Sequence, residues 1–267
     1  MVMKKEHHTV TICFTNNKGG SGKSTCCANV GYELAAAGKK VLLIDGDMQL
    51  NLSLSFFDED AVLAMAENEN NLYYAIRGKK DLESYRAATP YENLDIIPSS
   101  TLMSQVEYEL FTMIQREFIL KKCLQTIKES GEYDYILIDT PPTLGTWVIN
   151  ILCASDYVIV PVEASPWGLF GLANMFDFLN NIQDMTDARI MGVLITKVDE
   201  RKNYYRQTRE ILEGYEEIRV FDSFIHVDSA VEWAQDASKP VAVYKKTARS
   251  AAEFKKLTEE VIKYGGR

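Results

Sequence analysis

Short apolar runs alternate along the chain with longer segments whose apolar residues recur at helical spacing. The apolar runs are nearly continuous, which is typical of strands buried on both faces of a sheet. They predict strands at residues 9–15, 41–45, 94–97, 135–139, 157–162 and 190–196, with a last short strand around 220–225. The helical spacing predicts helices at 23–37, 102–128, 170–183, 204–215 and 250–264. This alternation favours an α/β fold with a mostly parallel, twisted sheet and helices on both faces.

The chain shows no division into separate units. No linker, internal repeat or low-complexity tract interrupts it, so we interpret residues 1–267 as a single domain. The polar, weakly patterned stretch at 56–93 is interpreted as a helical excursion beside the site. The residues before the first strand are too few for an N-terminal helix-turn-helix domain.

Composition and charge narrow the class of protein. Apolar residues make up 46% of the chain and charged residues 25%, which is ordinary globular usage. The net charge of −9 means that contact with nucleic acid needs a local basic patch. No apolar run approaches the roughly 20 residues of a membrane helix, and the N-terminal residues lack a signal-peptide core. Five cysteines without zinc spacing are interpreted as buried, reduced thiols, and the location as cytoplasmic.

A glycine-rich segment joins the first predicted strand to the first predicted helix. Residues 16–25 have the sequence NNKGGSGKST, the pattern of a phosphate-binding loop. Its glycines let backbone N–H groups point at phosphate oxygens, and the helix N-terminus adds positive potential. Lys23 can bridge the β- and γ-phosphates, and the Ser24 hydroxyl can bind Mg²⁺. The alternative is a glycine-rich turn with incidental lysines. The residues expected to contact the nucleotide are Lys18, Gly19, Gly20, Ser21, Gly22, Lys23, Ser24 and Thr25.

Aspartates stand where predicted strands end. Asp45 and Asp47 follow the second strand, and Asp139 ends a later one. The carboxyl ends of parallel strands gather at one edge of the sheet, next to the phosphate loop. There an aspartate can hold the hydration shell of Mg²⁺, and another can orient or deprotonate the attacking water. The alternative is helix capping, but three such aspartates beside a phosphate loop favour catalysis.

The loop departs from the usual Gly-x4-Gly-Lys-Ser/Thr spacing, because Asn17 stands where the first glycine is expected and Lys18 is additional. This variant resembles the deviant Walker A box of the ParA/Soj/MinD family, closest to the ParA/Soj-type partition ATPases. The resemblance spans residues 9–264. Its supporting blocks, in order, include VLLIDGDMQLN (41–51), YDYILIDTPPTLG (133–145), GVLITKVDER (192–201) and DASKPVAVY (236–244).

The resemblance implies a P-loop NTPase fold with ATP and Mg²⁺ as cofactors. It also implies an ATP-sandwich homodimer, and slow, partner-stimulated ATP hydrolysis that drives partitioning of plasmid, chromosome or mobile-element DNA. By the same resemblance, Lys18 is the signature lysine that reaches the partner subunit's nucleotide, and Lys23 is the phosphate lysine. Ser24 binds Mg²⁺ directly, whereas Asp47, which positions the attacking water, and the Walker B residue Asp139 act on the metal through water.

Two departures from the family pattern stand out. The proline of the family's Asp-x-Asp-Pro-Gln box is Met48 here, which leaves the first-switch backbone less constrained. Residues 226–230 have the sequence HVDSA and lack two arginines that the family commonly carries there, at Val227 and Ala230.

The partners follow from the resemblance and from charge. A ParB-like activator is implied, and nonspecific DNA is expected at a basic patch that consists of Lys245, Lys246, Arg249, Lys255 and Lys256. A second basic cluster occurs at 201–209, and a solvated helix face is the alternative for both. The alternative function is a MinD-like ATPase that cycles on a membrane or protein surface. It needs an amphipathic segment beyond the last helix, so membrane binding is not expected.

Overall fold

The computed structural model describes residues 8–169, 171–215 and 218–265. Seven strands form one sheet in the order β3-β4-β2-β5-β1-β6-β7. Every pairing is parallel except that of β3 with β4, which confirms the predicted α/β fold. The strands are β1 (Val10–Phe14), β2 (Val41–Asp45), β3 (Ala87–Ala88), β4 (Leu94–Ile97), β5 (Tyr135–Asp139), β6 (Tyr157–Glu163) and β7 (Arg189–Thr196).

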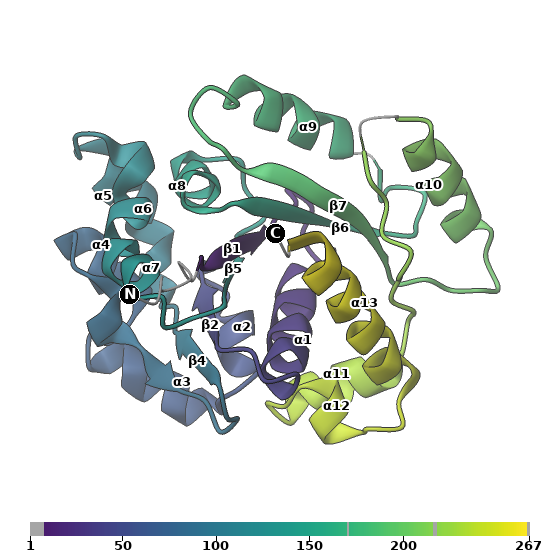
Figure 1. Ribbon diagram of the computed structural model, residues 1–267, viewed down its shortest axis with the longest axis horizontal. Coiled ribbons are helices and arrows are strands. Elements are labelled where there is room, and N and C mark those ends of the chain that lie inside the picture. The colour runs from purple at the N-terminus through teal and green to yellow at the C-terminus, as the bar shows by residue number, and fades with distance from the viewer. Residues whose placement is uncertain (1–7, 170, 216–217, 266–267) are drawn as a thin grey trace, which may run out of the picture.

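Helices cover both faces of this sheet, with α1 and α13 on one side and α8 and α9 on the other (Figure 1). The helices are α1 (Lys23–Ala36), α2 (Asn51–Leu54), α3 (Glu59–Glu67), α4 (Leu72–Gly78), α5 (Val106–Phe111), α6 (Ile119–Cys123), α7 (Gln125–Ser130), α8 (Thr146–Ala154), α9 (Leu172–Asn181), α10 (Tyr204–Glu213), α11 (Ser229–Asp236), α12 (Val241–Tyr244) and α13 (Arg249–Gly265). None of these described helices has the length and apolar character needed to cross a membrane.

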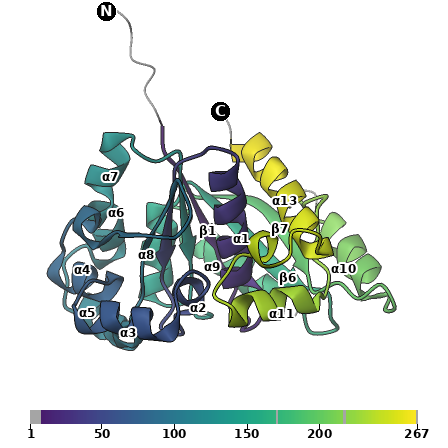
Figure 2. The same ribbon diagram turned by 90° about the horizontal axis from the view of Figure 1, so that it is seen from below.

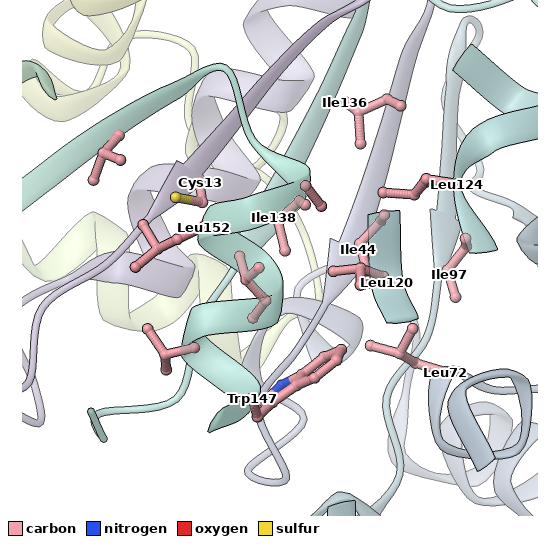
Figure 3. Packing of buried hydrophobic residues seen from close by; sticks show 14 of the residues in the cluster. Cys13, Ile44, Leu72, Ile97, Leu120, Leu124, Ile136, Ile138, Trp147 and Leu152 are labelled. Carbon is pink, nitrogen blue, oxygen red and sulfur yellow. The ribbon is translucent and has the colours of Figure 1, made fainter. Parts of the chain in front are cut away.

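The central strands bury both of their faces, as their continuous apolar runs predict. On β5, Ile136 and Ile138 pack into the cluster that includes α8, whereas Leu137 packs into the cluster that includes α1 and α13. Figure 3 shows the first cluster, with Trp147 of α8 close to the strand ends. Side chains alternate between the faces of a strand, so one short run supplies both cores.

Two predicted elements differ from the structure. The single helix expected at 102–128 is broken into α5, α6 and α7 with the 3-10 turns η2 (Thr101–Gln105) and η3 (Arg116–Phe118). The break between α5 and η3 falls at Gln115, which adopts a left-handed conformation with φ of 54°. The strand expected around 220–225 makes only one isolated bridge to β7, between Val220 and Val193. Its Asp222 and Ser223 N–H groups instead donate to the carboxylate of Glu260 on α13.

The remaining predicted helices are close to the observed ones. The helix expected at 170–183 is observed as α9, and Phe170 lies outside the described residues. The stretch at 56–93 contains α3 and α4, together with the 3-10 turn η1 (Leu82–Tyr85) and the short strand β3, which the sequence did not predict. All five cysteines are buried and free, as expected.

Candidate nucleotide-binding site

The phosphate loop connects the end of β1 to the start of α1 at the carboxyl edge of the sheet. Gly20 and Gly22 have φ angles of 73° and 93°, a region that residues with a Cβ rarely adopt. The loop is held from outside, because Thr196 of β7 donates its hydroxyl to the carbonyl of Ser21 at 2.9 Å. The backbone therefore has the conformation that a phosphate cradle needs.

Lys23 is the first residue of α1, and its side chain is buried at the loop. Its Nζ donates to the carbonyl oxygen of Lys18 at 3.3 Å. Burial lowers the pKa of Lys23, and the carboxylates of Asp139 and Asp47 oppose that shift. A buried ammonium with acidic neighbours is well suited to bind a phosphate chain that carries a bound cation.

Asp139 ends β5 and pairs in register with Asp45 of β2 and Phe14 of β1. Its side chain is fully buried, and among the described residues no donor, the nearby Ser24 hydroxyl included, makes a well-oriented hydrogen bond to either carboxylate oxygen. Burial and the neighbouring charge of Asp45 raise the pKa of Asp139 well above its usual value, whereas the nearby Ser24 hydroxyl and the charge of Lys23 oppose the rise. A buried carboxylate without a partner is costly unless a ligand or water satisfies it.

That orphaned carboxylate fits a hydrated Mg²⁺ ion beside a nucleotide, because Mg²⁺ prefers oxygen ligands and keeps several waters. The described residues contain no group of three or more His, Cys, Asp or Glu side chains placed to hold a metal ion by themselves. The ion would therefore depend on phosphate oxygens and the Ser24 hydroxyl as well as on water. This is the usual division of ligands at a phosphate loop.

Asp45 and Asp47 differ in their hydrogen bonds and in their access to the pocket. Asp45 accepts hydrogen bonds from the N–H and hydroxyl of Ser53 and from the N–H of Asp47, so its carboxylate is used within the protein. Asp47 lines the pocket, and its Oδ1 accepts from the N–H of Gln49 at 3.1 Å. Burial raises the pKa of Asp47, and the charge of Lys23 opposes the shift. Of these two aspartates, Asp47 is the one available to a ligand.

Lys18 extends away from the loop. Its Nζ forms an ion pair with Glu163, at the end of β6, at a distance of 2.7 Å. Each of the two side chains is 28% exposed. The ammonium group is therefore only partly exposed and is held by a carboxylate of its own chain.

A pocket of about 520 Å³ is lined by the phosphate loop, Lys23 and Asp47, and its volume is within the usual range of ligand sites. Figure 2 shows α2 and α11 along the same edge of the molecule. Other pocket residues were not predicted as site residues, among them Thr196 at the end of β7, Lys197 directly after it, and Asp228 and Gln235 from around α11. Gln235 donates to the hydroxyl of Thr25 at 2.9 Å. Thr196 and Lys197 lie in the GVLITKVDER block, which could have suggested them.

The basic side chains of the proposed patch do not form one continuous, unpaired positive surface. Arg249 forms ion pairs with Glu200 and Glu253, at 2.6 and 3.0 Å. Lys246 and Lys255 border a groove between α1 and α13, whereas Lys256 borders a groove beside Asp222. The second cluster is largely neutralised, because Arg201, Lys202, Arg206 and Arg209 are all paired with carboxylates.

The fold and the site together define a P-loop nucleotide-binding protein, since a phosphate loop at the carboxyl edge of a parallel sheet lies beside a buried lysine and a buried aspartate. The chain belongs to the ParA/Soj family of P-loop ATPases. A family model described as an AAA domain matches residues 9–191.

Two relatives extend the match over nearly the whole chain. The sporulation initiation inhibitor protein Soj of Bacillus subtilis is 36% identical and covers 95% of this chain and 98% of its own. The chromosome partitioning protein ParA of Caulobacter vibrioides is 31% identical and covers 94% and 93%. A crystal structure of a Borrelia burgdorferi plasmid partition protein bound to AMPPNP has the same fold. Its TM-score is 0.78 at 24% identity, over 96% of this chain and 99% of that one.

Proposed function

We propose that this chain hydrolyses ATP with Mg²⁺ and forms an ATP-sandwich homodimer that drives DNA partitioning of the ParA type. The observation that carries the proposal is the buried, unpartnered carboxylate of Asp139 next to the buried ammonium of Lys23 at the phosphate loop. The similarity to a chromosome partitioning protein over nearly the whole chain supports the choice of cargo.

The protein's own groups account for phosphate binding. The loop N–H groups and Lys23 hold the β- and γ-phosphates, and the hydroxyl of Ser24 with the carboxylate of Asp139, through water, holds the metal. Mg²⁺ supplies charge neutralisation on the phosphate oxygens when it is bound. Asp47 orients the attacking water with its second carboxylate oxygen, to which no described residue donates.

Dimerisation completes the site in this proposal. Lys18 leaves Glu163 and reaches the nucleotide of the partner subunit, where its charge stabilises the transferred phosphoryl group. Turnover therefore depends on the second subunit, which makes it slow until a ParB-like activator binds the dimer. The dimer binds nonspecific DNA through the lysines around α13 and so associates with the nucleoid.

The test compares Lys18→Ala with Lys23→Ala. We expect Lys23→Ala to weaken binding of a fluorescent ATP analogue by at least 10-fold, since it removes a direct phosphate contact. Lys18→Ala should bind the analogue within about twofold of the wild type, yet lose ATP-driven dimerisation and stimulated turnover. Equal loss of nucleotide binding in both variants would contradict the role of Lys18 in trans.

DNA binding is measured on the same proteins with ATP, with ADP and without nucleotide, at low and moderate salt. ATP-dependent binding that weakens with salt supports partitioning. Dimerisation on ATP without DNA binding in any state would overturn the DNA part of the proposal, and would favour a protein or membrane surface as the platform.

A further inference from the structure

The segment that carries Asp47 is a tight turn. The N–H of Leu50 donates to the carbonyl of Asp47 at 3.2 Å, which makes Met48 the second residue of the turn. Proline is favoured at that position because its fixed φ matches the turn, but Met48 is 43% exposed and supplies no such constraint. Leu50 adopts φ of 61°, a conformation that costs about 1 kcal/mol for a residue with a Cβ. The turn needs support from elsewhere.

That support comes from α8. The indole N–H of Trp147, a residue only 1% exposed, donates to the carbonyl of Gly46 at 2.9 Å. On its other side, the N–H of Gly46 donates to the carbonyl of Asp139 at 3.1 Å. A Cβ on Gly46 would lie 2.5 Å from that same carbonyl oxygen and 3.1 Å from Cδ1 of Ile151. The residue before Asp47 is therefore fixed between the end of β5 and α8.

The helix that carries the indole is itself anchored at its first turn. Glu107 of α5 accepts hydrogen bonds from the backbone N–H groups of Thr146 and Trp147, each at 3.1 Å. Its carboxylate thus caps the first turn of α8, where Gly145 offers no side chain. Figure 3 shows the indole of Trp147 at this end of the helix.

We propose that Trp147 is a positioning residue for ATP hydrolysis, whose hydrogen bond to Gly46 holds Asp47 in place and substitutes for the proline that this turn lacks at Met48. The inference rests on the proposed function of Asp47. Its physical basis is preorganisation, because a catalytic carboxylate loses effectiveness when its supporting backbone can move.

The test is a set of variants built on Trp147→Phe, which keeps an aromatic ring and removes the N–H donor. We expect kcat at saturating ATP to fall about 5- to 10-fold, the effect of one lost buried hydrogen bond on the placement of Asp47. Affinity for a fluorescent ATP analogue should stay within about twofold of the wild type. Adding Met48→Pro should restore at least half of the lost kcat, because no described residue accepts a hydrogen bond from the Met48 N–H.

The matched control is Ile151→Val, which trims the same contact region without touching the hydrogen bond. It should lower the free energy of unfolding by about 1 kcal/mol and leave kcat unchanged. If Ile151→Val lowers kcat as much as Trp147→Phe does, or if Met48→Pro restores nothing, Trp147 is only a packing residue and the proposal fails.

Amide hydrogen exchange at residues 46–50, measured without nucleotide, separates this proposal from the proposed function. Trp147→Phe should speed exchange there at least about 5-fold, and Met48→Pro should reverse the change. A wild-type protein without ATPase activity would overturn the proposed function and, with it, the effect of Trp147 on hydrolysis. Unchanged exchange in Trp147→Phe would overturn the positioning role alone.

Discussion

At the scale of single residues, the side chain of Lys18 is held in an ion pair within its own chain. The lysine is proposed to act on the partner subunit, yet here its ammonium is paired with Glu163 of the same chain. A partly exposed ion pair contributes from about 0 to 1 kcal/mol. In the proposed dimer, Glu163 would therefore compete with the partner subunit for Lys18, and an ion pair of this strength would not prevent the exchange.

Removing the negative charge of Glu163 should favour dimerisation. For Glu163→Gln we expect ATP-dependent dimerisation about 2- to 5-fold tighter than in the wild type, because the Lys18 ammonium no longer has a counter-ion in its own chain. Sedimentation with a nonhydrolysable ATP analogue measures the dissociation constant.

Glu132→Gln is the control, since Glu132 pairs with Arg86 at a similar distance of 2.8 Å and does not line the pocket. Dimerisation that is unchanged or weaker in Glu163→Gln, or equally tightened in Glu132→Gln, would count against competition for Lys18.

At the scale of secondary-structure elements, one side chain joins two helices at the border of the pocket. Asp228 caps α11 by accepting from the N–H of Ala230 at 2.9 Å. Its other oxygen accepts from the N–H and hydroxyl of Ser250, in the first turn of α13. Burial alone would raise the pKa of Asp228, but these hydrogen bonds outweigh burial and leave the pKa below its ordinary 3.8.

The depressed pKa gives Asp228 a pH-dependent contribution to stability. The contribution is present above the unfolded-state value and is lost as pH falls through the folded-state pKa. Asp228→Ala should therefore lower the free energy of unfolding by about 1–2 kcal/mol at pH 7. The difference between variant and wild type should shrink at pH values below about 4. Urea denaturation at pH 7, 4 and 3 measures the free energy of unfolding of both proteins. A difference that stays constant over that range would refute the pH-dependent contribution of Asp228.

At the scale of the whole molecule, charge decides what the surface can bind. The chain carries a net charge of −9, and many of its exposed basic side chains are paired with carboxylates. Lys245 and Lys246 precede α13 and are exposed. They are therefore better candidates for phosphate contacts than Arg249, whose guanidinium lies between two glutamates.

Their contribution should appear in the salt dependence of DNA binding. In the ATP-bound state, the double variant Lys245→Ala/Lys246→Ala should reduce the slope of log K against log salt by about 2, one unit for each lost phosphate contact. Arg206→Ala is the control, because Arg206 is exposed but paired with Glu210. An unchanged slope in the double variant would place the DNA contact elsewhere.

The fold and the phosphate loop could be predicted from the sequence, because both depend on residues close together in the chain. Buried strands are recognisable from runs such as VLLID, and the loop from NNKGGSGKST. The broken helix at 102–128 and the missing strand at 220–225 could not. The left-handed residue Gln115 interrupts the expected helix after α5. In the expected strand, two backbone N–H groups donate to the carboxylate of Glu260 on α13.

The amino-acid order alone was enough to specify the α/β architecture, the nucleotide class and the candidate aspartates, since strand ends and turns are local features. The counter-ion of Lys18, the support under the Asp47 turn and the neutralisation of Arg249 emerged only in the folded chain. Glu163 is 145 residues from Lys18, and Trp147 is 101 residues from Gly46. Hydrogen bonds and ion pairs act over a few ångströms in space, and no sequence spacing encodes which distant residues the fold brings within that range.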